Sequence, residues 1–143
     1  MIVVGQYDYA TAPTRASQLT YHGLQGHLAT LTSLAEYRFL FWTLNARQVW
    51  LAMTDLASEG TWIHAAGPEI DTPVTWSSGY WAPGEPNGNT DENCGLLWYH
   101  GLADYPCNRA FYSFVVEFEC HSDNMPAGRC YSKHCASHQQ YRT

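Results

Sequence analysis

Side chains with oxygen donors gather in a Gly-, Pro- and Asn-rich stretch between residues 81 and 107. Glu85, Asn87 and Glu92 lie close together there, and Asp104 follows further along. Carboxylate and amide oxygens are the ligands that Ca²⁺ prefers, and the ion takes roughly 6–8 of them in irregular geometry. The stretch therefore predicts a calcium site, provided that its backbone is held in place. The alternative is a solvated acidic loop that is kept for its turn residues.

Prolines and a cysteine pair could hold this backbone. Pro83 and Pro86 restrict the chain, and the spacing of Cys94 and Cys107 suits a small disulfide loop. The five cysteines include no C-x-x-C pair, so neither a zinc knuckle nor a thioredoxin-like motif is supported. Disulfides persist in oxidising compartments, and we therefore expect a secreted or extracellular protein.

The composition indicates a single compact domain with large aromatic anchors. Of the 143 residues, 14% are charged and 15% are aromatic, and the net charge is −6. An acidic chain does not suit nucleic acid, which attracts a basic surface. No apolar run approaches the roughly 18 residues that a membrane-spanning helix requires. We therefore expect neither a nucleic-acid partner nor a membrane span.

Two helices are expected in the first third of the chain. Pro13 lies in the first turn of one helix, which we expect to run to about Tyr21. Ser33 and Glu36 have the spacing of a capping box, which predicts a second helix that ends near Asn45.

Short strands account for the rest of the regular structure. The connection between residues 65 and 93 lacks strand or helix signals, and a connection of this length is usually functional. Residues 120–143 have no periodicity, which predicts an irregular tail after a domain of residues 1–119. The expected strands, rich in β-branched and aromatic residues, are Ile2–Val4, Tyr7–Tyr9, His27–Leu31, Val49–Met53, Thr61–His64, Gly95–Tyr99 and Ser113–Glu119.

The order of short motifs resembles the C-type lectin-like domain family from about residue 7 to residue 119. Glu85-Pro86-Asn87 by itself is a weak string, but in this order and with the cysteine pair the motifs are specific. The motifs are Trp50-Leu51-Ala52-Met53, Glu59-Gly60-Thr61-Trp62, Glu85-Pro86-Asn87, Glu92-Asn93-Cys94, Leu102-Ala103-Asp104 and Val116-Glu117-Phe118.

The resemblance implies an α+β fold of two helices and two small antiparallel sheets under a long irregular loop. It also implies that Glu85, Asn87, Glu92 and Asp104 hold calcium, with a cis Glu85–Pro86 bond. The same four side chains would bind a sugar with equatorial 3- and 4-hydroxyls, as in mannose, glucose, N-acetylglucosamine or fucose. The expected function is calcium-dependent binding of mannose-type glycans or glycoproteins, without enzymatic activity.

An auxiliary calcium site is implied less fully. Asp55, Glu59 and Asn93 resemble parts of that site in the family, but Gly88 stands where the family usually has an Asp. A surface turn with two acidic residues is an equally good interpretation.

Ala103 is the departure that bears most on function. Lectins of the family have an Asn there, which ligates calcium and bonds the sugar. Its loss favours the rival hypothesis of a structural or protein-interaction domain that binds neither sugar nor ion. A hydrolase that uses Glu85 and Glu92 is a remote third hypothesis. The family's long-range disulfide, which would join positions near Tyr21 and Val116, is absent at both ends.

The tail adds cysteines and histidines whose spacing matches no standard zinc template. One disulfide and one free or interchain thiol are expected there, so an interchain disulfide is a possible partner contact. These residues are Cys120, His121, Cys130, His134, Cys135 and His138.

Overall fold

The computed structural model describes residues 1–75, 79–110 and 112–119. The predicted tail, with its domain boundary, cysteines and histidines, lies outside the described residues. In chain order the elements are β1 (Ile2–Tyr7), α1 (Ala12–Ser17), β2 (Thr20–Tyr21), β3 (Leu24–Leu28), α2 (Leu34–Arg38), the π-helical turn η1 (Phe39–Thr43), β4 (Val49–Thr54), β5 (Ile63–His64), the 3₁₀ turn η3 (Asn89–Asp91), β6 (Cys94–Leu97), β7 (Leu102–Tyr105) and β8 (Tyr112–Phe118).

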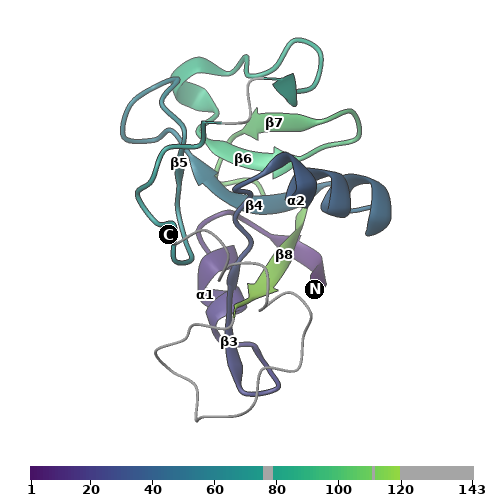
Figure 1. Ribbon diagram of the computed structural model, residues 1–143. Coiled ribbons are helices and arrows are strands. Elements are labelled where there is room, and N and C mark those ends of the chain that lie inside the picture. Colours follow the sequence, from purple (N-terminus) through teal and green to yellow (C-terminus); the bar gives the residue numbers. More distant parts are fainter. Residues whose placement is uncertain (76–78, 111, 120–143) are drawn as a thin grey trace, which may run out of the picture.

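The strands form one mixed sheet, and the α+β class is as predicted. The hydrogen-bonded order is β2-β3-β8-β4-β6-β7, with β1 on β8 and β5 on β4. Instead of two separate antiparallel sheets, the two halves are joined by a parallel pairing of β4 with β8, in which Trp50 lies opposite Phe114. Figure 1 shows β6 and β7 at one end of the molecule and β3 with α1 at the other.

The first helix ends earlier than predicted, at Ser17 rather than about Tyr21. Thr20 and Tyr21 form β2 instead and pair with Gln25 and Leu24 of β3. The two residues between them, His22 and Gly23, have positive φ angles of 50° and 83°. Positive φ at both central residues defines the two-residue hairpin turn whose twist matches the flanking strands. The hairpin therefore overrides the helical pattern.

The second helix begins at the predicted cap and changes its winding before it ends. Ser33 accepts a hydrogen bond from the Glu36 N–H at 3.3 Å. The Leu44 N–H then donates to the Phe39 carbonyl, five residues earlier, at 2.9 Å, so the last turn is π-helical. Asn45 follows with φ of 50°, which confirms the predicted end.

The expected strands are found with shifted ends, and β7 was not predicted. The sequence Leu-Ala-Asp-Tyr of β7 contains no β-branched residue, which explains the omission. The opening strand is β1, which ends at Tyr7 and leaves Tyr9 outside, while the strand expected from Thr61 begins at Ile63.

Two buried clusters lie on the opposite faces of β4. Val49, Leu51 and Met53 belong to one cluster, while Trp50 and Ala52 belong to the other. Because alternate side chains of a strand point to opposite faces, a strand buried on both sides reads as a continuous apolar run. The middle of the chain therefore anchors the fold.

Close packing takes the place of the missing long-range disulfide. Val116 is 1% exposed and belongs to the same cluster as Ala16. Gly26 lies between them, because a Cβ there would come within 2.7 Å of the Val116 Cγ1 and 2.8 Å of the Ala16 carbonyl oxygen. Tyr21, which we expected beside this contact, is 59% exposed. Ala16 of α1 is therefore the residue that closes the core against Val116.

Candidate calcium and carbohydrate site

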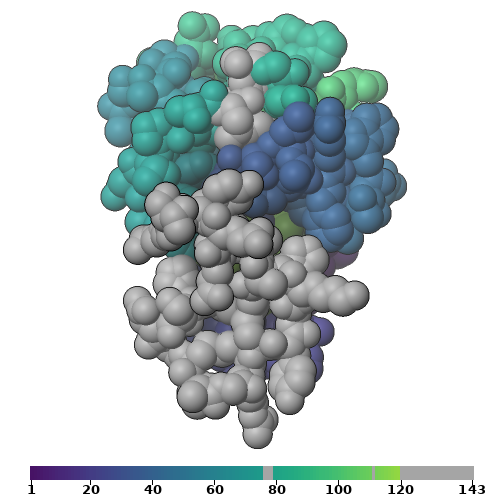
Figure 2. Space-filling model, in the orientation of Figure 1, coloured from purple at the N-terminus to yellow at the C-terminus, as the bar shows by residue number. Residues whose placement is uncertain are grey.

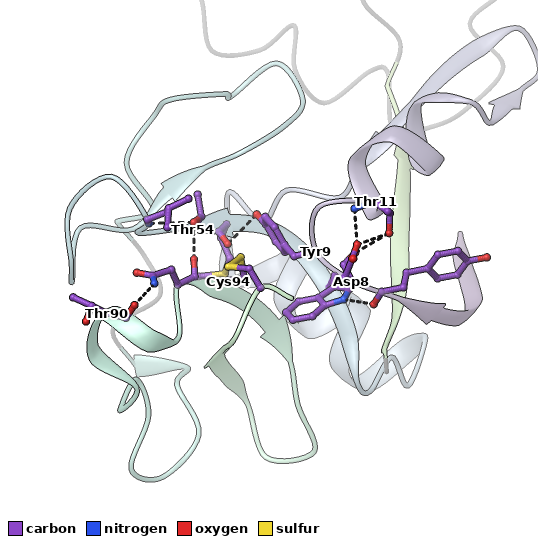
Figure 3. The surroundings of a disulfide bond; sticks show 12 residues. Asp8, Tyr9, Thr11, Thr54, Thr90 and Cys94 are labelled. Carbon is purple, nitrogen blue, oxygen red and sulfur yellow. Dashed lines mark hydrogen bonds between the residues drawn. A yellow bond between two sulfur atoms is a disulfide. The ribbon is translucent and has the colours of Figure 1, made fainter. Parts of the chain in front are cut away.

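A disulfide fixes the base of the candidate site. Cys94, at the start of β6, is bonded to Cys107, just after β7, with 5.2 Å between their Cα atoms. This confirms the predicted pair. Next to it, Asn93 accepts a hydrogen bond from the Thr54 hydroxyl and donates one to the Thr90 carbonyl at 2.8 Å (Figure 3). The long loop is thus tied to β4 and β6 where it enters the sheet.

Asp104 is the buried anchor of the loop. It lies on β7 and is 3% exposed. Its carboxylate accepts hydrogen bonds from the backbone N–H groups of Asn87, at 3.0 Å, and Gly88, at 2.9 Å. Hydrogen bonds to a charged acceptor are stronger than neutral ones. The loop is therefore folded over this carboxylate.

The four principal residues predicted from the sequence lie together. Carboxylate oxygens of Glu85, Glu92 and Asp104 all come within 4.8 Å of one another. The side-chain amide of Asn87 donates to Glu85 at 2.9 Å, and the Glu85–Pro86 bond is cis, as predicted. In Figure 2 the teal segment that contains this loop reaches the outer surface at the top of the view.

Crowding of negative charge shifts the proton affinity of these carboxyl groups. Burial, together with the hydrogen bond and charge of Asp104, raises the pKa of Glu85 to about 7. Burial and the charges of Asp104 and Asp91 also raise the pKa of Glu92. Carboxylates this close to one another are stabilised by a shared proton or by a cation.

The auxiliary residues are brought near the same cluster. Asp55 is 2% exposed, and one of its oxygens accepts from the Gly60 N–H at 2.8 Å. Its Oδ1 is buried without a hydrogen-bond partner among the described residues. Loss of solvation and the charges of Asp55 and Asp104 raise the pKa of Glu59, although that side chain is exposed. A buried carboxylate oxygen without a donor fits a cation better than an empty apolar contact.

Two positions lack the ligands that the resemblance would supply. The side chain of Glu92 fills the space that a Cβ at Gly88 would need, so no side chain fits at Gly88 unless Glu92 moves. Ala103 is 4% exposed and belongs to a buried apolar cluster. The donor set nevertheless consists of hard oxygens, which suits calcium.

One group of potential ligand atoms was missed by the sequence patterns. Atoms of His27, Glu117 and Glu119 also lie within 4.8 Å of one another, and these residues come from distant parts of the chain. Which residues of two strands face each other is not visible in either strand alone. Only the register that places His27 opposite Glu117 reveals the group.

The chain belongs to the C-type lectin domain family. The model of that family, described as "Lectin C-type domain", matches residues 12–115. Members of this carbohydrate-binding family are generally not enzymes. No helix among the described residues is long and apolar enough to cross a membrane.

Three relatives are each about one-third identical to this chain within the aligned segment, which spans only a small part of their own length. It is 34% identical over 91 residues to human C-type lectin domain family 4 member K, a match that covers 59% of the chain and 26% of the relative. It is 36% identical over 75 residues to the mouse low affinity immunoglobulin epsilon Fc receptor, covering 52% of the chain and 21% of the relative. A match to halomucin of Haloquadratum walsbyi is 35% identical over 95 residues, covering 60% of the chain and 1% of the relative.

Solved structures confirm the C-type lectin fold. The carbohydrate-recognition domain of cow CD23, solved in the presence of a GlcNAc2Man3 oligosaccharide, is 26% identical with a TM-score of 0.66, over 84% of this chain and 87% of that one. A calcium-independent type II antifreeze protein is 22% identical with a TM-score of 0.61, over 80% and 81%. The fold is therefore shared by a domain solved in the presence of an oligosaccharide and by a calcium-independent antifreeze protein.

Proposed function

We propose that this chain is a calcium-dependent lectin domain that binds mannose-type glycans through Glu85, Asn87, Glu92 and Asp104. The observation that carries the proposal is the convergence of three carboxylates around Asn87, in a loop held by a disulfide and by Asp104. An all-oxygen cluster with raised carboxyl pKa values is the arrangement that a divalent cation relieves.

The residues of the cluster would divide the recognition of a sugar between them. Calcium, when bound, supplies coordination positions for two vicinal hydroxyls. The carboxylates of Glu85 and Glu92 accept hydrogen bonds from those hydroxyls, while the Asn87 amide can donate one. Equatorial 3- and 4-hydroxyls suit this pattern, which favours mannose, glucose, N-acetylglucosamine and, by related geometry, fucose. Asp55 and Glu59 would support a second ion beside the first.

The relation to the cow CD23 domain supports a glycan ligand, because that domain was solved in the presence of an oligosaccharide that contains mannose and N-acetylglucosamine. The disulfide supports an extracellular or secreted location, since such bonds persist in oxidising compartments. Glycoproteins displayed outside the cell are therefore the partners that we propose.

The test measures calcium binding and sugar binding in the same protein. Calcium should raise the melting temperature and a chelator should lower it, since a ligand of the folded state adds RT ln(1 + [L]/Kd), about 2.7 kcal/mol at one hundred times Kd. Retention on mannose resin should require calcium. Glu85→Gln should abolish both effects.

The matched control is Asp71→Asn. Asp71 is exposed, lies outside the cluster and has a φ of 66°, a conformation that Asn tolerates well. This variant should keep the thermal shift and the retention. If wild-type protein shows neither a calcium-dependent shift nor retention, the lectin proposal fails.

The second candidate function is a structural or protein-interaction domain that needs no calcium. The missing ligands at Gly88 and Ala103 favour it, and so does the calcium-independent antifreeze relative. A flat thermal response to calcium and chelator, in a well-folded protein, would select this candidate.

A further inference from the structure

Three potential metal ligands lie on one face of the β3–β8 pair. His27 and Glu117 are direct cross-strand partners, and Glu119 lies two residues beyond Glu117. Directly opposite residues, and residues two apart on one strand, share a face of a sheet. The other face carries Leu28, which is fully buried in the cluster that contains Ala16 of α1. His27 and Glu117 therefore face away from α1, and Glu119, just past the end of β8, offers a ligand atom within 4.8 Å of theirs.

The His27 ring is oriented so that one nitrogen is left to bind. Its Nδ1 lies 3.0 Å from the Leu28 carbonyl oxygen, which can only accept, so Nδ1 carries the proton. In the neutral ring, Nε2 then presents its lone pair. This Nε2 atom is buried without a hydrogen-bond partner among the described residues. Histidines that bind metals typically donate the other ring N–H to a carbonyl or carboxylate in this way.

A glycine holds the ring in this position. Gly67 has a φ of 75°, and a Cβ there would come within 2.8 Å of the His27 Cε1 and 2.9 Å of its Nδ1. The backbone of the loop between β5 and η3 therefore packs directly against the imidazole. The contact with the loop and the hydrogen bond to Leu28 together fix the orientation of the ring. The direction in which Nε2 points is therefore fixed as well.

Among the described residues, acidic groups outnumber basic ones around this group. The Thr30 hydroxyl lies 3.2 Å from a Glu69 oxygen and 3.3 Å from a Glu117 oxygen, but it has one proton to donate. The charges of Glu119 and Glu36 also act on Glu117. The amino group of Met1 lies within electrostatic range of Glu117, but its hydrogen bond goes to the Val116 carbonyl at 2.6 Å.

We propose that His27, Glu117 and Glu119 form a second metal site, which takes a borderline transition-metal ion such as Zn²⁺ rather than calcium. Imidazole nitrogen suits zinc, whereas calcium takes oxygen ligands. Three protein ligands leave one tetrahedral position for a water molecule or for a donor from another molecule. The site is separate from the cluster of Glu85, Glu92 and Asp104 and rests on different elements.

The experiment titrates the full chain with zinc chloride by calorimetry in saturating calcium, which keeps the first cluster occupied. His27→Gln and Glu119→Gln should each weaken zinc binding by at least about ten-fold, because even outer partners of metal ligands are worth that much. The matched control is His100→Gln, since His100 is an exposed imidazole in the turn between β6 and β7. That variant should bind zinc as the wild type does.

A spectroscopic readout separates this site from thiols and imidazoles elsewhere in the chain. On addition of zinc, the ¹⁵N resonance of His27 Nε2 should shift, and this shift should be lost in Glu119→Gln. Cobalt in place of zinc should give no thiolate charge-transfer band that depends on His27. Unchanged zinc affinity in both variants, or an unperturbed His27 resonance in zinc-bound protein, overturns the proposal. Calcium binding that depends on His27, without zinc binding, would overturn the assignment of the metal.

Discussion

The two clusters of potential ligands differ in what holds them in place. The first cluster, Glu85, Glu92 and Asp104, is assembled by an irregular loop that folds over a buried carboxylate on β7. The second, His27 and the Glu117–Glu119 segment, is assembled by the register of two paired strands. One arrangement depends on side-chain hydrogen bonds and a disulfide, whereas the other depends on a backbone ladder.

This difference predicts how each cluster responds to change. A loop held by a few side chains can be released by one substitution, and it can also adapt its oxygen donors to a cation with irregular coordination. A pair of ligands on adjacent strands keeps its spacing as long as the sheet is intact. Variants that separate the calcium response from the zinc response therefore test the comparison directly.

The largest effect is expected from Asp104→Ala. The substitution leaves the partly buried N–H groups of Asn87 and Gly88 without their acceptor and removes a ligand. Hydrogen bonds to charged groups contribute roughly 1.5–3 kcal/mol each, so we expect the free energy of unfolding to fall by about 3 kcal/mol or more. Urea unfolding should show this loss, and calcium should no longer stabilise the protein.

Zinc binding at His27 should survive in the fraction of Asp104→Ala that remains folded. The control is Asp91→Asn, because Asp91 is an exposed neighbour in η3. Equal stability of Asp104→Ala and wild type would show that the loop is not organised by this carboxylate.

Removing the disulfide should have the next largest effect. A bridge across a loop of this length contributes about 3 kcal/mol in the chain-entropy model, and Cys94→Ala/Cys107→Ala should lose about that much stability. Calcium affinity should fall as well, because the bridge ties the loop to β6. Zinc affinity should stay within a factor of about two, since neither β3 nor β8 contains a cysteine among its residues. Equal losses of both affinities would mean that the clusters are not independent.

Ala103→Asn should increase the affinity for calcium and sugar, an effect smaller than the two losses of stability. The new amide would stand next to Asp104 and add an oxygen for the ion and an N–H donor for the sugar. A hydrogen bond to an ion-polarised group is worth roughly 1.5–3 kcal/mol, which corresponds to about ten-fold or more in affinity. Calcium titration and mannose-resin retention measure the gain. Lower stability with an unchanged calcium response would show instead that residue 103 faces only the apolar cluster.

A change of pH should have the smallest effect on the free energy of unfolding. Because the pKa of Glu85 is raised from 4.5 to about 7 in the folded protein, the folded chain holds a proton that the unfolded chain releases. In chelator, the free energy of unfolding should therefore fall as the pH rises from about 4.5 to about 7. Glu85→Gln should reduce this slope. The remaining slope reports other carboxyl groups with raised pKa values, among them Glu92, Asp55 and Glu117.

Calcium requires the ionised carboxylates, so its affinity should decrease as the pH falls below about 7. Thermal shift at several pH values, with calcium and with chelator, measures both trends. A calcium affinity that rises on acidification would contradict the assignment of Glu85 as a ligand.

The sequence predicted the first cluster because its residues are close together in a recognisable order. Glu85, Asn87 and Glu92 lie in one loop, which leads directly into the disulfide-bonded Cys94. It could not predict the second cluster, because His27 and Glu117 meet only through a strand register that no local pattern encodes. The same limit applies to α1, whose helical pattern continues past Ser17 although the chain there pairs in a hairpin.

Local sequence patterns also could not predict how the second helix winds. Ser33 and Glu36 predicted where the second helix begins, and Asn45 where it ends. Nothing in the sequence indicated the π-helical turn between them, which contains the buried Leu40 and Phe41. Trp42, on the same turn, is 72% exposed.

The pairing of the first strand with the last has a consequence for protein engineering. Ile2 of β1 lies opposite Val115 of β8, so the described fold starts and finishes at neighbouring points of one sheet. A unit whose two ends meet can be spliced into a surface loop of a host without stretching either partner. In such a fusion, the loop of oxygen donors would lie away from the insertion point and would stay exposed for binding.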